Sequence, residues 1–430
     1  MHLFYHRTSS VVNMVGVEME RQILHSDLNS FYASVEIMLE PSLRGKAVAV
    51  CGSTEDRHGI VLAKSELAKK AGVKTGMVNF EARKLCPGLI MLPPHYEQYL
   101  KYSKLTRDIY QRYTNQVEPF GMDECWLDVS ASRAVYGDGV KIAEEIRSSV
   151  RDELGMTVSI GVSFNKIFAK LGSDMKKPDA VTVIGEDDYK EKVWPLPASE
   201  LLYVGRATSA KLERYGIRTI GDIAKASPDF LKRLLGVNGL AIWRYATGTD
   251  QSRVVDVDYS VPIKSVGHGI TCVADLVNEE EVWKVMLELS QDIGHKLRLY
   301  DIKARGVQIT IKNNGLMYKQ YQTQLDIATQ SPMEIALKAR ELFSKNYTWS
   351  TPVRAVTVRT INLIPANTPQ QVSLFDDMER RKKRELLEDT VEDIRRRFGK
   401  RAVYSASLMG DLKMPGRGVH EVIMPGVMYE

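Results

Sequence analysis

The sequence predicts a multidomain chain that combines α/β and α+β regions. Its 430 residues are more than one hydrophobic core usually serves, so roughly two to four domains are expected. In the first part of the chain, short apolar runs alternate with helical periodicities, as in α/β folds. Further along, strands of alternating polarity are separated by helical stretches, which favours an α+β region.

The first region, residues 21–190, alternates strands and helices. The run "KAVAVCG" has the continuous apolar character of a buried strand. Phe31, Val35 and Met38 recur at i, i+4 and i+7, which predicts a helix that ends before Pro41. The residues before this region, 1–20, form an N-terminal extension that lacks the basic start and long apolar core of a secretion signal.

Two further regions follow. Residues 191–252 begin at the prolines of "WPLPASELLYVG" and continue as short helices broken by glycines. Residues 253–366 contain alternating strands such as "GVQITIK". That strand has an apolar row and a polar row, which are Val307, Ile309 and Ile311, and Gln308, Thr310 and Lys312.

The last region, residues 367–430, is polar and is joined to the body by a linker. It carries the basic block "RRKKR" at 380–384. Apolar residues then recur at helical spacing and predict one amphipathic helix, at Leu387, Val391, Ile394 and Phe398.

Composition limits the class of protein. Hydrophobic residues make up 44% of the chain and charged residues 26%, as in a folded protein. The net charge of +5 is compatible with a nucleic-acid partner but is also common among proteins that bind none. The four cysteines lie far apart, which argues against a zinc site or disulfide framework and fits a cytoplasmic location. No apolar run approaches the roughly 20 residues of a membrane span.

Acidic residues stand out at two places in the first region. In "ILHSDLNSFYASVE", Asp27 ends an apolar run, and in "PFGMDECWLDVS", Asp123 and Glu124 follow a turn marked by Gly121. Adjacent residues of a strand face opposite sides, but at a hairpin tip both can point into one space. A divalent cation would relieve the repulsion between their charges. Alternatively, Asp27 caps the helix that follows, and the other two are solvated turn acids.

If Asp27 ends a neighbouring strand of the same sheet, three carboxylates converge at one edge. Such a set suits Mg²⁺, which binds a few carboxylates and completes its shell with water and phosphate oxygens. Two ions about 4 Å apart could then activate a hydroxyl and steady a leaving pyrophosphate. The implied reaction is phosphoryl transfer.

The motifs "DLNSFYASVE", "GMDECWLD" and "SIGVSFNKIFAKLGSDMKKPDA" resemble those of the Y-family, or translesion, DNA polymerases. The resemblance continues through "KSVGHGIT", "RAVTVRTINLIP" and "QVSLF", and so covers residues 23–375. It implies a right-hand polymerase with a palm, small fingers inserted at about residues 31–97, a helical thumb with a helix-hairpin-helix and a little-finger domain. The expected activity is template-directed, low-fidelity DNA synthesis with lesion bypass, on primer-template DNA and deoxynucleoside triphosphates.

The resemblance also assigns residues to the catalytic centre. Two Mg²⁺ ions would be held by Asp27, Asp123, Glu124 and the backbone carbonyl of Leu28. Tyr32 falls on the steric gate that excludes a ribose 2'-hydroxyl. Phe31 lies beside it at the nucleotide pocket, although core packing is the alternative that its helical face favours. Lys170 matches a lysine that meets the triphosphate, whereas Lys166, Lys176 and Lys177 are expected to be solvated helix charges.

The fingers depart from the family pattern. In "SELAKKAGVKTG", Glu66 stands at a tyrosine position and Lys69 at an arginine position. Lys69 can still meet phosphate as a point charge without the two-pronged geometry of arginine. Ionised Glu66 cannot replace a hydroxyl donor and is not counted as a nucleotide contact. Gly121 replaces a serine. The arginine-to-lysine change resembles the polymerase V catalytic-subunit branch, so a polymerase IV or polymerase V style stays open.

Two further segments point to DNA. "YVGRATSAKLERYGIRTIGDIA" resembles a helix-hairpin-helix in which Gly205 would approach a DNA phosphate, although Ala207 replaces the second glycine. A plain helix pair is the alternative. The polar row that ends at Lys312 would track the DNA backbone or be an ordinary solvated face.

The segment "QVSLF" resembles the bacterial sliding-clamp-binding peptide, with Gln371, Leu374 and Phe375 as anchors. The basic tail beyond it would add salt-dependent DNA binding or be a solvated helix face. Two alternative functions are a non-catalytic adaptor that binds DNA and the clamp, and a nucleotidyl cyclase with activity independent of a template. The need for accessory repair proteins stays open.

Overall fold

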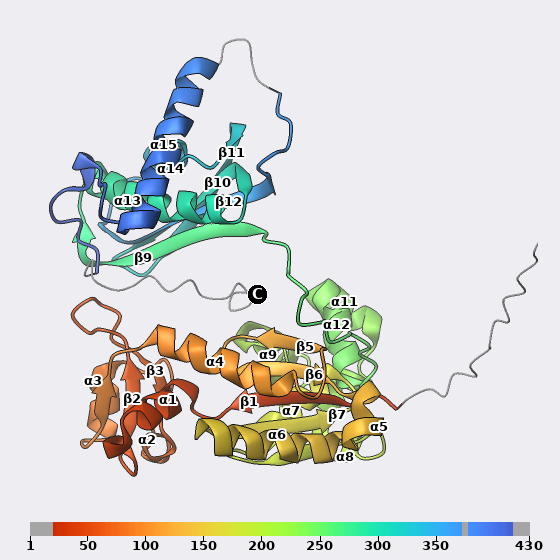
Figure 1. Ribbon diagram of the computed structural model, residues 1–430. Helices are drawn as coiled ribbons and strands as arrows, with labels where there is room; N and C mark the ends of the chain where they lie inside the picture. The colour runs from red at the N-terminus through yellow and green to blue at the C-terminus, as the bar shows by residue number, and fades with distance from the viewer. Residues whose placement is uncertain (1–19, 372–376, 416–430) are drawn as a thin grey trace, which may run out of the picture.

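The computed structural model describes residues 20–371 and 377–415, which form three β-sheets and a helical region (Figure 1). Residues 1–19 of the N-terminal extension lie outside this range. Within the described ranges, no helix has the length and apolar character needed to cross a membrane.

The first sheet has five strands in the order β5-β6-β1-β7-β8, antiparallel except for the parallel pair β7 and β8. Its strands are β1 (Ile23–Leu28), β5 (Val117–Phe120), β6 (Glu124–Asp128), β7 (Val158–Ser163) and β8 (Val181–Ile184). The helices around it are α4 (Tyr96–Tyr110), α5 (Arg133–Tyr136), α6 (Gly139–Leu154), α7 (Lys166–Met175) and α8 (Tyr189–Val193), with the 3₁₀ turn η2 (Ser130–Ser132).

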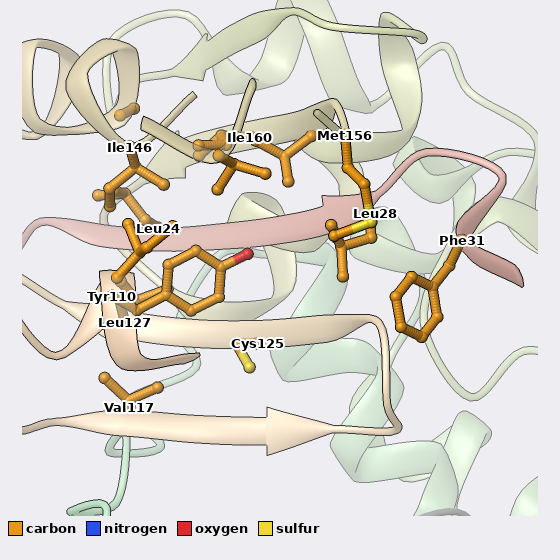
Figure 2. Close-up of a cluster of buried hydrophobic side chains, with 14 of the residues drawn as sticks. Leu24, Leu28, Phe31, Tyr110, Val117, Cys125, Leu127, Ile146, Met156 and Ile160 are labelled. Atoms are coloured by element: carbon orange, nitrogen blue, oxygen red, sulfur yellow. The ribbon is translucent and has the colours of Figure 1, made fainter. Parts of the chain in front are cut away.

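Apolar side chains on both faces of this sheet are buried. Leu24 and Leu28 of β1 pack with Tyr110 and Ile146 from α4 and α6 (Figure 2). On the other face, Ile23 packs with side chains of β6 and α7. The central strand β1 is therefore covered on both sides, which leaves its end as the place where polar groups can gather.

Close backbone packing seats α7 on the sheet. A Cβ atom at Gly161 would lie 1.8 Å from the Ala169 carbonyl oxygen and 2.6 Å from the Ser173 nitrogen. At Gly172 on the helix, an added Cβ would lie 3.1 Å from the Gly161 Cα. Only glycine at these positions lets the helix backbone lie this close to β7.

The second sheet is a small one that follows helix α1 (Phe31–Leu39). Its strand order is β3-β2-β4, with β2 antiparallel to β3 and parallel to β4. The elements are η1 (Pro41–Leu43), β2 (Val48–Cys51), β3 (Val61–Lys64), β4 (Ile90–Leu92), α2 (Glu66–Lys70) and α3 (Asn79–Leu85). The predictions of a helix that ends before Pro41 and of a strand in "KAVAVCG" are both confirmed.

The helical region contains η3 (Ala198–Glu200), α9 (Arg206–Glu213), α10 (Ile220–Lys225), α11 (Pro228–Leu235) and α12 (Val237–Ala246). Leu212, Ile223 and Leu231 are buried in its shared core. Helix α10 begins with a capping box between Thr219 and Asp222, which satisfies backbone donors at the helix start.

The third sheet is fully antiparallel, in the order β11-β10-β12-β9. Its strands are β9 (Ser265–Leu276), β10 (Ile302–Asn313), β11 (Tyr318–Thr329) and β12 (Val353–Pro365). Helices α13 (Glu279–Leu299) and α14 (Pro332–Asn346) cover one face. Val307, Ile309 and Ile311 are buried on that face, so the predicted alternation is confirmed. An ion pair of 2.5 Å between Arg57 and Asp275 joins the second sheet region to the third.

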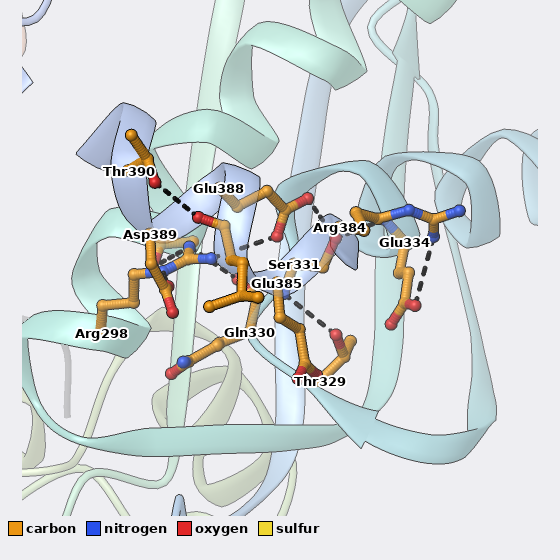
Figure 3. Close-up of polar contacts among 12 residues, drawn as sticks. Arg298, Thr329, Gln330, Ser331, Glu334, Arg384, Glu385, Glu388, Asp389 and Thr390 are labelled. Atoms are coloured by element: carbon orange, nitrogen blue, oxygen red, sulfur yellow. Dashed lines mark hydrogen bonds and ion pairs between the residues drawn. The ribbon is translucent and has the colours of Figure 1, made fainter. Parts of the chain in front are cut away.

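The tail docks on the helical layer of the third sheet (Figure 3). It forms α15 (Met378–Phe398) and the turn η4 (Ala406–Leu408). Arg298 of α13 pairs with Glu388 and Asp389 of α15, each at 3.1 Å. Arg381 and Arg384 of the basic block pair with Glu334 of α14 at 3.2 and 3.3 Å. These two arginines are therefore not free helix charges.

The predicted helix is present, but the two outer residues of its apolar stripe are exposed. Leu387 is 64% exposed and Phe398 is 75% exposed. Ion pairs hold the helix, Val391 and Ile394 are half-buried, and fully buried apolar side chains follow it, where Leu408 and Leu412 pack with Leu287 and other residues of the helical layer. Before the tail, Ala328 binds both flanks of the linker: its N–H donates to Gln370 at 2.7 Å, and its carbonyl accepts from Arg381 at 3.1 Å.

Candidate active site

The three predicted acids gather at one end of the first sheet. Asp27 at the end of β1 is the cross-strand partner of Glu124 at the start of β6. The Leu28 N–H donates to the Asp123 carbonyl at 2.9 Å. Gly121 adopts φ 86°, a left-handed conformation that suits glycine, in the turn that precedes the acids. Neighbouring strand ends therefore bring the acids together, as the turn and strand pattern predicted.

Burial shapes the charge of these acids. It raises the pKa of Asp27 to about 7, with Lys177 opposing the shift and Glu124 adding to it. Burial and the neighbouring Glu124 raise the pKa of Asp123 to about 6. Burial would also raise the pKa of Glu124, but contacts with His25 and Lys170 outweigh it and hold this pKa below its usual range. Buried carboxylates close together at this sheet end are costly unless cations lie near them.

Two lysines supply positive charge at the site. The Lys177 ammonium lies 2.7 Å from Asp27 Oδ2 and 2.8 Å from Asp174 Oδ1. The Lys170 ammonium lies 2.5 Å from Glu124 Oε2 and 3.9 Å from Asp174 Oδ2. Among residues 20–371 and 377–415, no three His, Cys, Asp or Glu side chains are arranged to hold a metal ion as they stand. Lys177 therefore pairs with Asp27, and Lys170 pairs with Glu124.

The expectation of solvated charges was wrong for two of three lysines. Lys177 binds Asp27, and its side chain is only 25% exposed. Lys166 is buried, pairs with Glu118 at 2.6 Å and lies 4.3 Å from the Trp126 ring centroid. Lys176 is exposed, as expected. The i, i+4 spacing of Lys170 and Asp174 on α7, with Lys177 just beyond the end of the helix, was the missed signal.

His25 was also missed. Its ring is fully buried, with Nδ1 2.8 Å from the Ser173 hydroxyl and Nε2 3.2 Å from Glu124 Oε2, the latter without hydrogen-bond alignment. Burial lowers the pKa of His25, which favours the neutral ring. The signal was its position two residues before Asp27, because alternate residues of a strand share a face.

Tyr32 lies against a fixed aromatic platform. Its ring stacks on Tyr99 with centroids 4.1 Å apart and 8° between the planes. The Tyr99 hydroxyl donates to Glu36, whose carboxylate is also 2.9 Å from His95 Nδ1. Phe31 is only 3% exposed and belongs to the core cluster of the first sheet, which favours its packing role over a nucleotide contact.

Residues of the second sheet region lie near the start of α1. Lys69 is half exposed, 3.9 Å from Glu66. The Ser30 hydroxyl donates to Glu66 at 3.2 Å, so this departure from the family pattern reaches the loop that follows Asp27.

The predicted DNA contacts lie elsewhere. Gly205 is the N-cap of α9, and Lys312 lies near the end of β10 in the row opposite the buried one. Gln371 is exposed, whereas Leu374 and Phe375 lie outside the described residues. A cavity of about 350 Å³ runs between α7 and the loop before α9, and its lining includes Lys170 and Gly205.

Known proteins share these features. Residues 26–174 match the impB/mucB/samB family, and residues 263–374 match the impB/mucB/samB family C-terminal domain. The chain is 52% identical over 393 residues to DNA polymerase IV of Acetivibrio thermocellus, covering 91% of this chain and 98% of that protein. It is 35% identical over 388 residues to DNA polymerase IV 1 of Bacillus subtilis, covering 89% and 92%.

A solved structure has the same fold. The Y-family DNA polymerase chimera Dbh-Dpo4(243-245)-Dbh superposes with a TM-score of 0.71 at 21% identity, covering 80% of this chain and 99% of that one. The fold, the family matches and the full-length relatives agree. The chain therefore belongs to the impB/mucB/samB family of Y-family translesion polymerases and is a DNA-directed DNA polymerase.

Proposed function

We propose that the chain extends a primer 3'-hydroxyl by two-metal phosphoryl transfer, with two Mg²⁺ ions held by Asp27, Asp123, Glu124 and the Leu28 carbonyl. The cross-strand pairing of Asp27 with Glu124, next to Asp123, carries this proposal. The donors fit a hard divalent cation, because they are carboxylates crowded in a buried place where two pKa values are raised. When bound, the ions lower the pKa of the attacking hydroxyl and neutralise charge on the leaving pyrophosphate.

Tyr32 is proposed as the gate against ribonucleotides. Its stacking on Tyr99, which Glu36 holds by a hydrogen bond, supports a ring that cannot turn aside. A fixed ring beneath the sugar would leave no room for a 2'-hydroxyl. Tyr32→Ala should therefore gain ribonucleotide incorporation in primer extension, whereas unchanged selectivity would remove the assignment.

Lysines are proposed to meet the triphosphate as point charges. Lys170 is only 15% exposed and already binds Glu124, so its ammonium is within reach of an anion at the acid cluster. Lys69, on α2 of the proposed fingers, is exposed and available for phosphate. Neither offers the two-pronged contact of arginine.

The proposed DNA path joins the four parts of a right hand. We assign the first sheet to the palm, the second to the fingers, the helical region to the thumb and the third sheet to the little finger. The cavity between Lys170 and Gly205 supports a primer end that approaches the acids along the thumb. The row with Lys312 lies on the face of the third sheet away from α13 and α14, where it could follow the DNA backbone. Low fidelity and bypass of damaged templates are expected from the resemblance to translesion polymerases.

Partners and location extend the proposal. Gln371, Leu374 and Phe375 are proposed to bind the sliding clamp, and alanine at the last two should abolish stimulation by the clamp. The four cysteines are all unpaired and buried, which supports a reducing cytoplasm. The named relatives favour a polymerase IV style. Dependence on accessory repair proteins is tested by assaying primer extension with the purified chain alone.

The deciding experiment is primer extension with Mg²⁺ and four deoxynucleotides on undamaged and abasic templates. Wild type should extend both, and an Asp123→Ala, Glu124→Ala double variant should extend neither while still binding the primer-template. Extension by the double variant would refute the proposed metal site. Synthesis without a template would point to another palm enzyme.

A further inference from the structure

Lys177 occupies a particular position among the charges of the active site. It lies beyond the last turn of α7, and its ammonium bridges Asp27 of β1 and Asp174 of the same helix, at 2.7 and 2.8 Å. The Asp27 side chain is only 11% exposed, whereas that of Asp174 is 45% exposed. One cation therefore links a buried acid with an acid that reaches solvent.

The ion pair between Lys177 and Asp27 affects metal binding because Asp27 is buried. A buried carboxylate without a cation is costly, and an ammonium at 2.7 Å neutralises it. The same ammonium opposes a divalent ion at Asp27, because like charges a few ångströms apart repel strongly in a partly buried site.

Asp174, the more exposed acid, is a second partner for Lys177. Asp174 lies between Lys177 and Lys170, at 2.8 and 3.9 Å from their ammonium groups. If Asp27 turns to a metal ion, Lys177 keeps one ion pair without leaving the helix end. Gly161 fixes this geometry, since it lets α7 lie directly on β7.

We propose that Lys177 is the counter-cation of the metal-free site. Its ammonium holds Asp27 until a divalent cation displaces it, and Asp174 retains the displaced ammonium. The proposal rests on the metal site proposed above and adds two positioning residues to it. Lys177 thus lowers the affinity of the empty enzyme for divalent cations and stabilises the site in their absence.

The test measures Mn²⁺ binding to the full-length protein at pH 8, without DNA or nucleotide, from the electron paramagnetic resonance signal of free Mn²⁺. Lys177→Met should bind Mn²⁺ about tenfold more tightly, because one opposing charge is gone. Lys177→Arg keeps the charge and should stay near wild type. Lys176→Met is the matched control, since the adjacent lysine is exposed, and its affinity should not change.

Asp174→Asn should change the Mn²⁺ affinity in the opposite direction. Without its outer partner, Lys177 should remain on Asp27 and Mn²⁺ should bind more weakly. A general charge effect of Asp174 would persist in the Lys177→Met background, whereas the proposed retention of the ammonium would not. The double variant should therefore bind Mn²⁺ like Lys177→Met alone.

Lys177→Met should also lower the melting temperature in EDTA and increase the rise in melting temperature that Mn²⁺ produces. Equal Mn²⁺ affinity in wild type and Lys177→Met would overturn the lysine proposal and leave the metal site intact. Absence of any Mn²⁺ binding that depends on Asp123 would refute the metal site and the lysine proposal with it.

Discussion

Replacing Gly161 by alanine should lift α7 away from the sheet that it covers. The added Cβ would lie 1.8 Å from the Ala169 carbonyl oxygen and 2.6 Å from the Ser173 nitrogen. Both neighbours are backbone atoms of α7, so no rotamer change can relieve the clash and the helix must shift by about 1 Å or more. Overpacking by a methyl group costs about 1–3 kcal/mol, and the upper end is expected here.

A cost of about 3 kcal/mol corresponds to a roughly 100-fold loss of protection when local opening is measured. Hydrogen exchange measured by mass spectrometry on peptides of β7 and α7 reports the protection of these backbone amides, even in a multidomain protein. Polymerase activity should fall in parallel, because α7 carries Lys170 to Glu124. Gly88→Ala is the control, since no atom lies within 4 Å of its added Cβ. Unchanged exchange in Gly161→Ala would refute the packing argument.

Other predictions address charge and the tail. The pKa of Asp123 is raised to about 6 by burial and Glu124, so the stability that the protonated form contributes is lost as pH rises through about 6. Between pH 4.5 and 7.5 in EDTA, the melting temperature of wild type should therefore fall more than that of Asp123→Asn, whose stability lacks this loss. Arg298→Ala should speed proteolysis within α15 about tenfold by removing two ion pairs, whereas Arg396→Ala, paired within its own helix, should not. Tyr99→Phe should destabilise by about 1–3 kcal/mol, because buried Glu36 loses a donor, which thermal unfolding can measure.

Local patterns predicted the parts of the fold that depend on local physics. Alternation at Val307, Ile309 and Ile311 predicted a strand with one buried face, because strand residues alternate by geometry. The glycine turn before Asp123 predicted acids at a strand end, since a left-handed residue there requires glycine or a small polar side chain. The family resemblance assigned Asp27, Asp123 and Glu124 to one site, which the strand pattern alone left as one of two alternatives.

Contacts between distant charges could not be predicted in this way. Lys177 and Asp27 are 150 positions apart, and a lysine just beyond a helix end has the same local pattern whether it meets solvent or a buried acid. The tail shows the same limit. Its apolar spacing predicted the helix, but the partners of Arg381 and Glu388 on α14 and α13 are marked by no periodicity.

The double attachment at Ala328 determines how a clamp bound to the linker would be carried. Gln370 and Arg381 both bind this one residue of β11, so each of these two described residues is held to the third sheet. A sliding clamp that bound the proposed peptide from Gln371 onward would therefore engage the chain one residue beyond a point that is fixed to the third sheet.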